Sequence, residues 1–250
     1  MDSEIYFSDP EHLDDPYDCQ VDMLATLARA AKDNSLTLSK AVRRPLSTFL
    51  ELLQGLGIHR FQSRRQTTLQ RLLDSVTFLD QIQNDILGFG VCCFSGTVDN
   101  ALMWSHYAGG HKGVCLYYEI PVSFIVDPAN GILGYSPVTY GDEALFDWLV
   151  STRQLDGITQ LDAAIQIMKR ALTAKGKDWA YENEARLIRP ETGTLRIEPE
   201  FLKQLCFGLR TSDQHKERLR EIVEDKYNDV TFAEIRHEGN RDFGIAVYEV

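Results

Sequence analysis

The hydrophobic periodicity changes at Gly88, and this change restricts the possible folds more than any other feature of the sequence. Residues 20–87 carry apolar side chains at steps of three and four, which is typical of amphipathic helices. The clearest apolar stripe consists of Leu69, Leu72, Leu73, Val76, Leu79, Ile82 and Ile86. After Gly88, short strand patterns and helical patterns follow one another irregularly. A doubly wound parallel sheet requires a regular strand–helix alternation, so the sequence favours an α+β domain.

The second part of the chain contains most of the expected strands. Strand patterns occupy residues 5–8, 89–94, 113–120, 135–140, 185–188, 205–209, 232–236 and 243–250. Helical patterns occupy residues 101–108, 155–172 and 213–226. We expect a single domain over residues 1–250. Its α+β body at about 88–250 would hold a mixed, mainly antiparallel sheet, with a helical layer or insertion at about 20–87.

The charge balance is acidic, with a formal net charge of −11. A broad nucleic-acid or acidic-membrane surface needs excess Lys and Arg, so the balance argues against both kinds of partner. No apolar run is long enough to span a bilayer, and the N-terminal residues lack the apolar core of a signal peptide. We therefore expect a cytoplasmic protein without a membrane partner.

The five cysteines show no Cys-x-x-Cys spacing. Three of them, Cys92, Cys93 and Cys115, lie within apolar runs. This pattern is typical of buried, reduced thiols rather than of a disulfide framework or a zinc site. We expect no bound metal.

Residues 95–113 gather polar and aromatic side chains around the helix expected at 101–108. Trp104, His106 and Tyr107 fall within one or two turns of each other, and Ser95 ends the preceding strand pattern. An imidazole and a phenol beside an indole suit a stacking platform with hydrogen-bonding tips. The structural alternative is a buried aromatic helix in which His106 bonds to a backbone carbonyl.

His106 and His111 are also candidate metal ligands or binding residues. They lie on either side of the Gly109-Gly110 turn, and their spacing matches no zinc motif. A metal-dependent hydrolase or nuclease would use these histidines together with glutamates from elsewhere in the chain.

Residues 175–188 form a second cluster, which contains Lys177, Trp179, Glu182, Glu184 and Arg186. If a strand begins near Glu184, a period of two places Glu182, Glu184 and Arg186 on one face. Two carboxylates beside a guanidinium fit a structural ion-pair ladder. They also fit a catalytic pair, in which one carboxylate stabilises an oxocarbenium-like centre and the other orients a nucleophile.

Ser8 ends the first strand pattern and is followed by two Asp-Pro pairs, Asp9-Pro10 and Asp15-Pro16. Such a tight loop either closes a turn or holds a ligand group. Ser8 is therefore a candidate binding residue, with turn formation as its structural alternative.

Together and in this order, these clusters resemble a bacterial family known as a domain of unknown function. The elements that carry the resemblance are Ser8-Asp9-Pro10, Asp14-Asp15-Pro16-Tyr17-Asp18, Phe94-Ser95, Met103-Trp104-Ser105-His106-Tyr107, His111-Lys112-Gly113, Lys177, Trp179 and Glu182-Asn183-Glu184-Ala185-Arg186. The Met-Trp-x-His-Tyr element is the most specific of them. Two departures stand out: Asp14 replaces the family's usual Asn, and the family's usual first strand is missing before residue 5.

Three functions remain open at this point. The Glu-x-Glu layout is similar to that of ADP-ribosyltransferases, which implies NAD as a co-substrate, no tightly bound cofactor, and a role in bacterial stress, toxin or phage-defence biology. In that hypothesis, Glu184 stabilises the ribose charge and Glu182 orients the acceptor. The candidate catalytic residues are Glu184, Glu182 and His106, and the expected contact residues are Ser8, Ser95, Trp104, Tyr107, His111, Lys177, Trp179 and Arg186.

The second function is a non-catalytic module that binds a nucleotide, or a protein partner through the helices at 20–87. The third is a hydrolase or nuclease-like enzyme that uses the histidines and glutamates.

Overall fold

The structure is a computed structural model, and it describes residues 3–19, 26, 86, 88–151, 166, 168–239 and 244–250. The helices predicted for 20–87 and for most of 155–172 lie outside the described residues. Within the second segment, residues 168–171 are helical.

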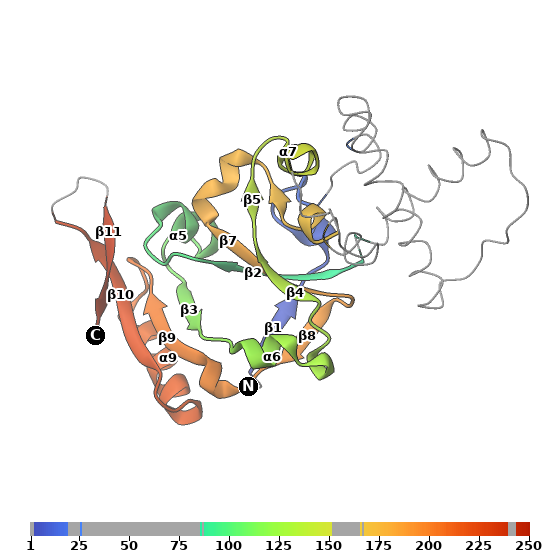
Figure 1. Cartoon of the computed structure of the whole chain (residues 1–250). Helices are drawn as coiled ribbons and strands as arrows, with labels where there is room; N and C mark the ends of the chain where they lie inside the picture. Colours follow the sequence, from blue (N-terminus) through green and yellow to red (C-terminus); the bar gives the residue numbers. More distant parts are fainter. Residues whose placement is uncertain are drawn as a thin grey trace, which may run out of the picture. The chain divides into compact units, whose positions relative to one another are not determined.

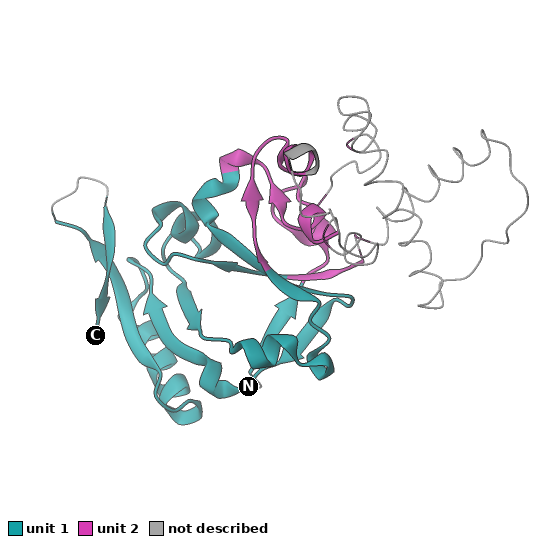
Figure 2. Ribbon diagram, viewed as in Figure 1, with its two compact units in different colours: residues 1–7, 92–135, 179–250 teal, residues 8–91, 136–178 magenta. Residues whose placement is uncertain are grey.

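The chain divides into two compact units (Figure 2). Unit 1 comprises residues 1–7, 92–135 and 179–250, and unit 2 comprises residues 8–91 and 136–178. The expectation of a single domain over residues 1–250 stays a prediction.

The largest sheet of unit 1 has the strand order β11-β10-β9-β3 (Figure 1). Its strands are β3 (Val114–Tyr118), β9 (Leu202–Phe207), β10 (Thr231–His237) and β11 (Ile245–Glu249). β3 pairs with β9 and β10 pairs with β11 in antiparallel fashion, whereas β9 and β10 are parallel. β3, β9 and β11 are rich in Val, Ile, Leu, Phe or Tyr, which pack well on a pleated surface.

Alternation along β9 gives this sheet two apolar faces. Leu205 and Phe207 pack against Val223 of α9 (Asp213–Lys226). Cys206 points to the opposite face, where it packs with Trp104 of α5 (Ala101–Tyr107). The sheet is thus sandwiched between two helices, and α5 carries the aromatic cluster that the sequence singled out.

Two smaller sheets contain the other strands of unit 1, and residues 90–91 and 136–137 at the ends of two of these strands belong to unit 2. β1 (Glu4–Phe7) pairs antiparallel with β8 (Gly193–Arg196), and β7 (Glu184–Arg189) lies between β2 (Gly90–Ser95) and β4 (Gly134–Pro137). Ile5, Phe7, Cys92, Leu187 and Ile197 form a shared core. Short helical segments connect the strands, namely α6 (Val122–Val126), η2 (Pro128–Asn130) and η4 (Pro199–Phe201).

The described part of unit 2 is smaller. It contains η1 (Pro10–His12), β5 (Thr139–Tyr140), α7 (Ala144–Ser151) and β6 (Ala174–Lys175). β5 and β6 are parallel, and Lys175 forms a buried ion pair with Asp18, with a nitrogen–oxygen distance of 3.4 Å. The 3₁₀ helix η3 (Lys177–Glu182) begins in unit 2 and ends in unit 1.

The predicted α+β class with a mixed, mainly antiparallel arrangement is confirmed. One strand prediction is wrong in detail: residues 135–140 form two strands, because β4 ends at Pro137, which has no backbone N–H to continue a ladder. The prediction that Cys93 is buried is also wrong. Alternation along β2 turns Cys92 into the core and leaves Cys93 exposed.

Among the described residues, no helix is both long and apolar enough to cross a membrane.

Candidate functional site

The site begins with the N-terminal cap of α5, which also ties the helix to η3. Asn100 Oδ1 accepts hydrogen bonds from the backbone N–H groups of Leu102, at 2.9 Å, and Met103, at 3.3 Å. The same side chain donates through Nδ2 to the carbonyl of Tyr181, at 2.7 Å. One amide therefore starts the helix and holds it against a segment 81 residues further along the chain.

The opposite end of α5 turns through three left-handed residues, Gly109, Gly110 and His111, with φ values of 55°, 68° and 70°. Two glycines adopt this backbone without strain, whereas His111 is held there by its surroundings. Its Nε2 lies 3.1 Å from Ser105 Oγ, and its Nδ1 is buried without a hydrogen-bond partner. Burial, together with the charges of Arg210 and His237, lowers the pKa of His111.

The turn between η3 and β7 separates the two glutamates of the second cluster. Glu182 is the last residue of η3, Glu184 is the first residue of β7, and Asn183 between them has a φ of 46°. The prediction that Glu182 and Glu184 share a strand face is therefore wrong. A left-handed residue breaks the period-two alternation before the strand begins, so each carboxylate enters a different environment.

Glu184 is paired with Arg186, on the same face of β7. Arg186 Nε lies 2.6 Å from Glu184 Oε1, and Arg186 Nη2 lies 3.0 Å from Glu184 Oε2. Arg186 is 0% exposed. Two parallel bonds between a guanidinium and a carboxylate make a strong, directional pair. This placement matches the structural ion-pair alternative for these two residues.

Glu182 instead meets the aromatic cluster. The hydroxyl of Tyr107 donates to Glu182 Oε1 at 2.6 Å, and Ser95 Oγ donates to the carbonyl of Glu182 at 2.7 Å. Glu182 is 3% exposed, whereas Tyr107 is 46% exposed. The two clusters that the sequence placed about 75 residues apart thus lie in contact, with a solvent-facing phenol over a buried carboxylate.

Aromatic rings extend from this pair along η3. The ring centroid of Tyr181 lies 6.1 Å from that of His106 and 6.1 Å from that of Trp179. The ring planes are tilted by 34° and 31°, respectively. His106 also makes an edge contact with Tyr107, at 6.5 Å. We call these four rings, Trp179, Tyr181, His106 and Tyr107, the aromatic row.

Trp104 does not belong to the aromatic row. It is buried against Cys206, Ala233 and Ile235, and its indole N–H donates to the carbonyl of Val98 at 2.6 Å. Its neighbours are thus core side chains, which is the structural alternative set out for it. A seven-residue helix has too few turns for its sequence alone to show which of its aromatic residues face the core.

The remaining predicted site residues, Ser8 and Lys177, belong to unit 2. Ser8 exchanges two backbone hydrogen bonds with Val91, and its hydroxyl donates to the carbonyl of Asp9 at 3.1 Å. Lys177 forms an exposed ion pair with Asp142 at 2.7 Å. That contact raises the pKa of Lys177 and lowers the pKa of Asp142.

Metal ligation has no geometric support in the described part of the chain, where no group of three His, Cys, Asp or Glu side chains is placed to hold an ion. His106 lies against Tyr107 and Tyr181, whereas His111 bonds to Ser105. The hydrolase or nuclease hypothesis therefore gains no supporting contact among these residues.

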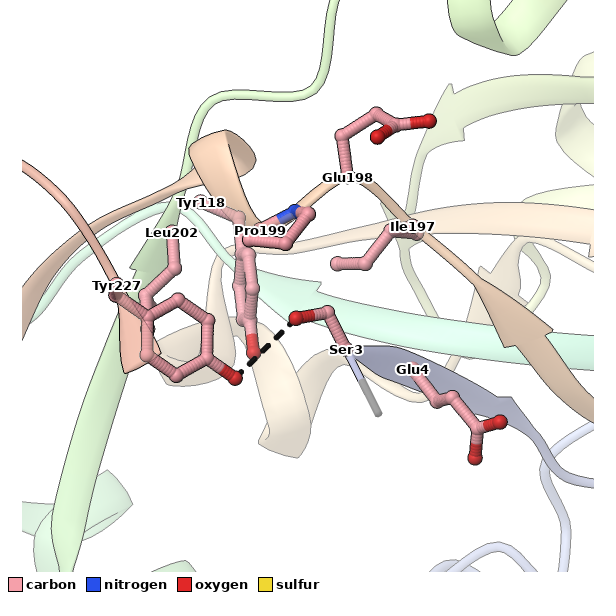
Figure 3. A pocket seen from close by; sticks show the side chains of 8 residues that line it. All are labelled: Ser3, Glu4, Tyr118, Ile197, Glu198, Pro199, Leu202 and Tyr227. Carbon is pink, nitrogen blue, oxygen red and sulfur yellow. Dashed lines mark hydrogen bonds between the residues drawn. The ribbon is translucent and has the colours of Figure 1, made fainter. Parts of the chain in front are cut away.

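A pocket of about 170 Å³ lies elsewhere in unit 1 (Figure 3). Its lining consists of Ser3, Glu4, Tyr118, Ile197, Glu198, Pro199, Leu202 and Tyr227. Ser3 Oγ donates to the hydroxyl of Tyr227 at 3.3 Å, and burial together with Tyr227 and Cys92 raises the pKa of Tyr118. None of the residues predicted for the site lines this pocket.

Comparison with known proteins adds a family match. A profile for a family described as "Protein of unknown function (DUF2971)" matches residues 103–187. This segment runs from α5 to β7, so it contains both Tyr107 and Glu182. The match supports similarity to an uncharacterised domain family, while the finer motif pattern stays a prediction. Neither the curated proteins nor the solved structures give a match.

Sequence reasoning missed two residues of this arrangement. Asn100 is not among the predicted site residues, yet its side chain caps α5 and joins it to η3. Tyr181 stood within the second cluster without an assigned role, although it is the central ring of the aromatic row. A tyrosine two residues after a tryptophan was the available signal for it.

Proposed function

We propose that the chain is an NAD-dependent ADP-ribosyltransferase-like enzyme with the Tyr107–Glu182 pair at its reacting centre. The observation that carries this proposal is the 2.6 Å hydrogen bond between a 46% exposed phenol and a 3% exposed carboxylate. A ligand arriving from solvent meets the phenol first and finds a fixed negative charge beneath it. The reacting carboxylate is thus assigned to Glu182 rather than to Glu184.

The chemistry of NAD suits a carboxylate in this position. Breaking the nicotinamide–ribose bond develops positive charge on the ribose, and a fixed anion in a low-dielectric setting stabilises that charge more than one in water. The bond from Tyr107 and the turn at Asn183 fix the orientation of Glu182 before a substrate arrives. A carboxylate held in this way needs little reorganisation during the reaction.

The aromatic row supplies a surface for the rings of the dinucleotide. His106 and Tyr107 are exposed, and Trp179 and Tyr181 are partly exposed. Aromatic faces favour offset stacking on planar rings such as nicotinamide or adenine. Stacking beside Glu182 would place the ribose close to the carboxylate.

One observation favours a second function, that of a nucleotide-binding module without catalysis. Both oxygens of Glu184, the carboxylate that the sequence proposed for ribose stabilisation, are engaged by Arg186. If Glu182 serves the same structural purpose through Tyr107, the aromatic row would bind a nucleotide that is not cleaved.

Nicotinamide release from NAD by the purified full chain tests the first function. We expect Glu182→Gln to lower the release rate at least about 100-fold, which is the typical cost of removing one stabilising group from a charged transition state. The matched control is Glu191→Gln, at an exposed position of the same unit, and it should leave the rate unchanged.

A binding assay with ADP-ribose distinguishes the enzyme from the non-catalytic module. Titration with ADP-ribose, followed by tryptophan fluorescence, should show a signal that Trp179→Phe removes. Binding with no nicotinamide release in any variant would overturn the enzyme and support the module. Neither binding nor release would contradict both.

A further inference from the structure

Cys115 and Cys206 lie directly opposite each other in neighbouring antiparallel strands. β3 and β9 pair in a register that joins Val114 to Phe207, Cys115 to Cys206 and Leu116 to Leu205. Both thiols face the side of the sheet that packs against Trp104. The pair is therefore placed by the sheet itself and not by flexible loops.

The hydrogen-bond pattern of the ladder gives the spacing of this pair. The N–H of Gly208 donates to the carbonyl of the opposite residue, Gly113, at 3.0 Å, so this is a hydrogen-bonded pair. Such pairs alternate along an antiparallel ladder, and two steps further along come Cys115 and Cys206. The Cα atoms of a hydrogen-bonded pair are about 5.5 Å apart, which falls in the range of about 4.4–6.8 Å found for disulfides.

The Cβ atoms of the pair, in contrast, are farther apart than a disulfide requires. Opposite Cβ atoms in antiparallel strands are about 4.5–5.5 Å apart, with the larger value in hydrogen-bonded pairs, whereas a disulfide brings them to about 3.8 Å. Closing the bond must therefore pull β3 and β9 together locally. Strained disulfides are more easily reduced than relaxed ones, which makes them reversible.

We propose that Cys115 and Cys206 are a reversible oxidation site, at which a low-molecular-weight disulfide such as oxidised glutathione converts the two free thiols into a cross-strand disulfide. Cys115 is partly exposed, so its thiolate attacks the oxidant first, forms a mixed disulfide and releases one reduced thiol. The buried thiolate of Cys206 then attacks the sulfur of Cys115 and releases the second. Two protein thiols and one small disulfide thus become one protein disulfide and two small thiols.

The surroundings make this reaction slow at neutral pH. Burial raises the pKa of Cys115, and burial together with Cys115 and Glu234 raises the pKa of Cys206 to about 12. Since the thiolate is the reacting species, both thiols remain reduced under mild conditions and oxidation accelerates as the pH rises. Cys115, Cys206, Trp104 and Ala108 share one core cluster, so the bond changes the packing beneath α5.

The test is incubation of the folded full chain with oxidised glutathione at alkaline pH, followed by thiol counting and peptide mapping without reductant. Trypsin places Cys115 in peptide 113–153, Cys206 in peptide 204–210, and Cys92 with Cys93 in a third peptide. We expect a cross-link between the first two peptides that returns to free thiols with excess reduced glutathione. Cys93→Ser should keep this cross-link and Cys115→Ser should abolish it.

Two outcomes would overturn the proposal. One is that the folded protein gains only mixed disulfides with glutathione. The other is that the cross-link appears only after addition of urea, together with other cysteine pairings, because this would show that the folded ladder does not direct it. Circular dichroism of each variant establishes that the comparison is made between folded proteins.

Discussion

Glu182 and Glu184 in unit 1 and Asp142 in unit 2 each bond to a neighbouring side chain through their carboxylates, but in different surroundings. Glu182 and Glu184 are buried and bonded to Tyr107 and Arg186. Asp142 pairs with Lys177 at 2.7 Å, yet the two side chains are 62% and 66% exposed. The distances are nearly equal, so distance does not separate the two regions.

Burial is what separates them. Water screens an exposed pair and hydrates either partner when the other is removed, so such pairs contribute little. In the interior, a carboxylate that loses its partner cannot be rehydrated. The buried contacts of Glu182 and Glu184 should therefore respond strongly to single changes, and the Asp142–Lys177 pair weakly.

The largest effect is expected for Arg186→Met, because it leaves the buried Glu184 without its guanidinium. Breaking a buried ion pair from one side costs about 3–5 kcal/mol of unfolding free energy. Urea denaturation monitored by circular dichroism measures this loss. The control is the double variant Glu184→Gln with Arg186→Met, in which a neutral amide should recover much of the stability. A loss below about 1 kcal/mol for Arg186→Met would remove the distinction between the two regions.

A smaller effect is expected for Tyr107→Phe, which deletes one hydrogen bond to the buried carboxylate of Glu182. Hydrogen bonds to charged groups contribute about 1.5–3 kcal/mol, so we expect a loss near 2 kcal/mol in the same denaturation assay. Tyr135→Phe is the matched control, since Tyr135 is 57% exposed and should be neutral. Equal losses for the two variants would mean that the contact with Glu182 contributes no stability.

Sequence patterns predict the helices α5 and α9 well and the irregular turn at Asn183 poorly. The helical patterns at 101–108 and 213–226 correspond to α5 (Ala101–Tyr107) and α9 (Asp213–Lys226) in the structure. Both follow from local rules of periodicity and capping. The left-handed backbone at Asn183 depends on neighbours distant in sequence, including the hydrogen bond from Gly96 to the Asn183 carbonyl. The partners of Glu182 were therefore not readable from its spacing to Glu184.

A pH effect of intermediate size is expected at His111. The pKa of His111 is lowered by burial and by Arg210 and His237, so the unfolded chain binds its proton more readily than the folded one. Stability should rise with pH between the lowered pKa and the unfolded value of about 6.5, and its contribution is lost as the pH falls. His111→Asn keeps a residue type that tolerates a positive φ and should flatten the stability profile in that window. An unchanged profile would contradict this assignment.

The smallest effect is expected for Lys177→Met. The contact lowers the pKa of Asp142 and raises the pKa of Lys177, so its stabilisation is present at neutral pH. It is lost as acid protonates Asp142 or as alkali deprotonates Lys177. A double-mutant cycle with Asp142→Asn should give a coupling that is near the detection limit and vanishes with added salt. A coupling as large as that of Arg186 with Glu184 would refute the role assigned to burial.

The left-handed residue Asn183 has a consequence for how substitutions around Glu182 and Glu184 act. In an unbroken strand, Glu182 and Glu184 would respond together to any change on their common side. Because the left-handed residue separates them, the environment of Glu182 can change while Glu184 keeps its ion pair with Arg186 in β7. A β-branched residue at position 183 strongly resists that backbone conformation, so it would disturb the turn that sends the two carboxylates into different environments.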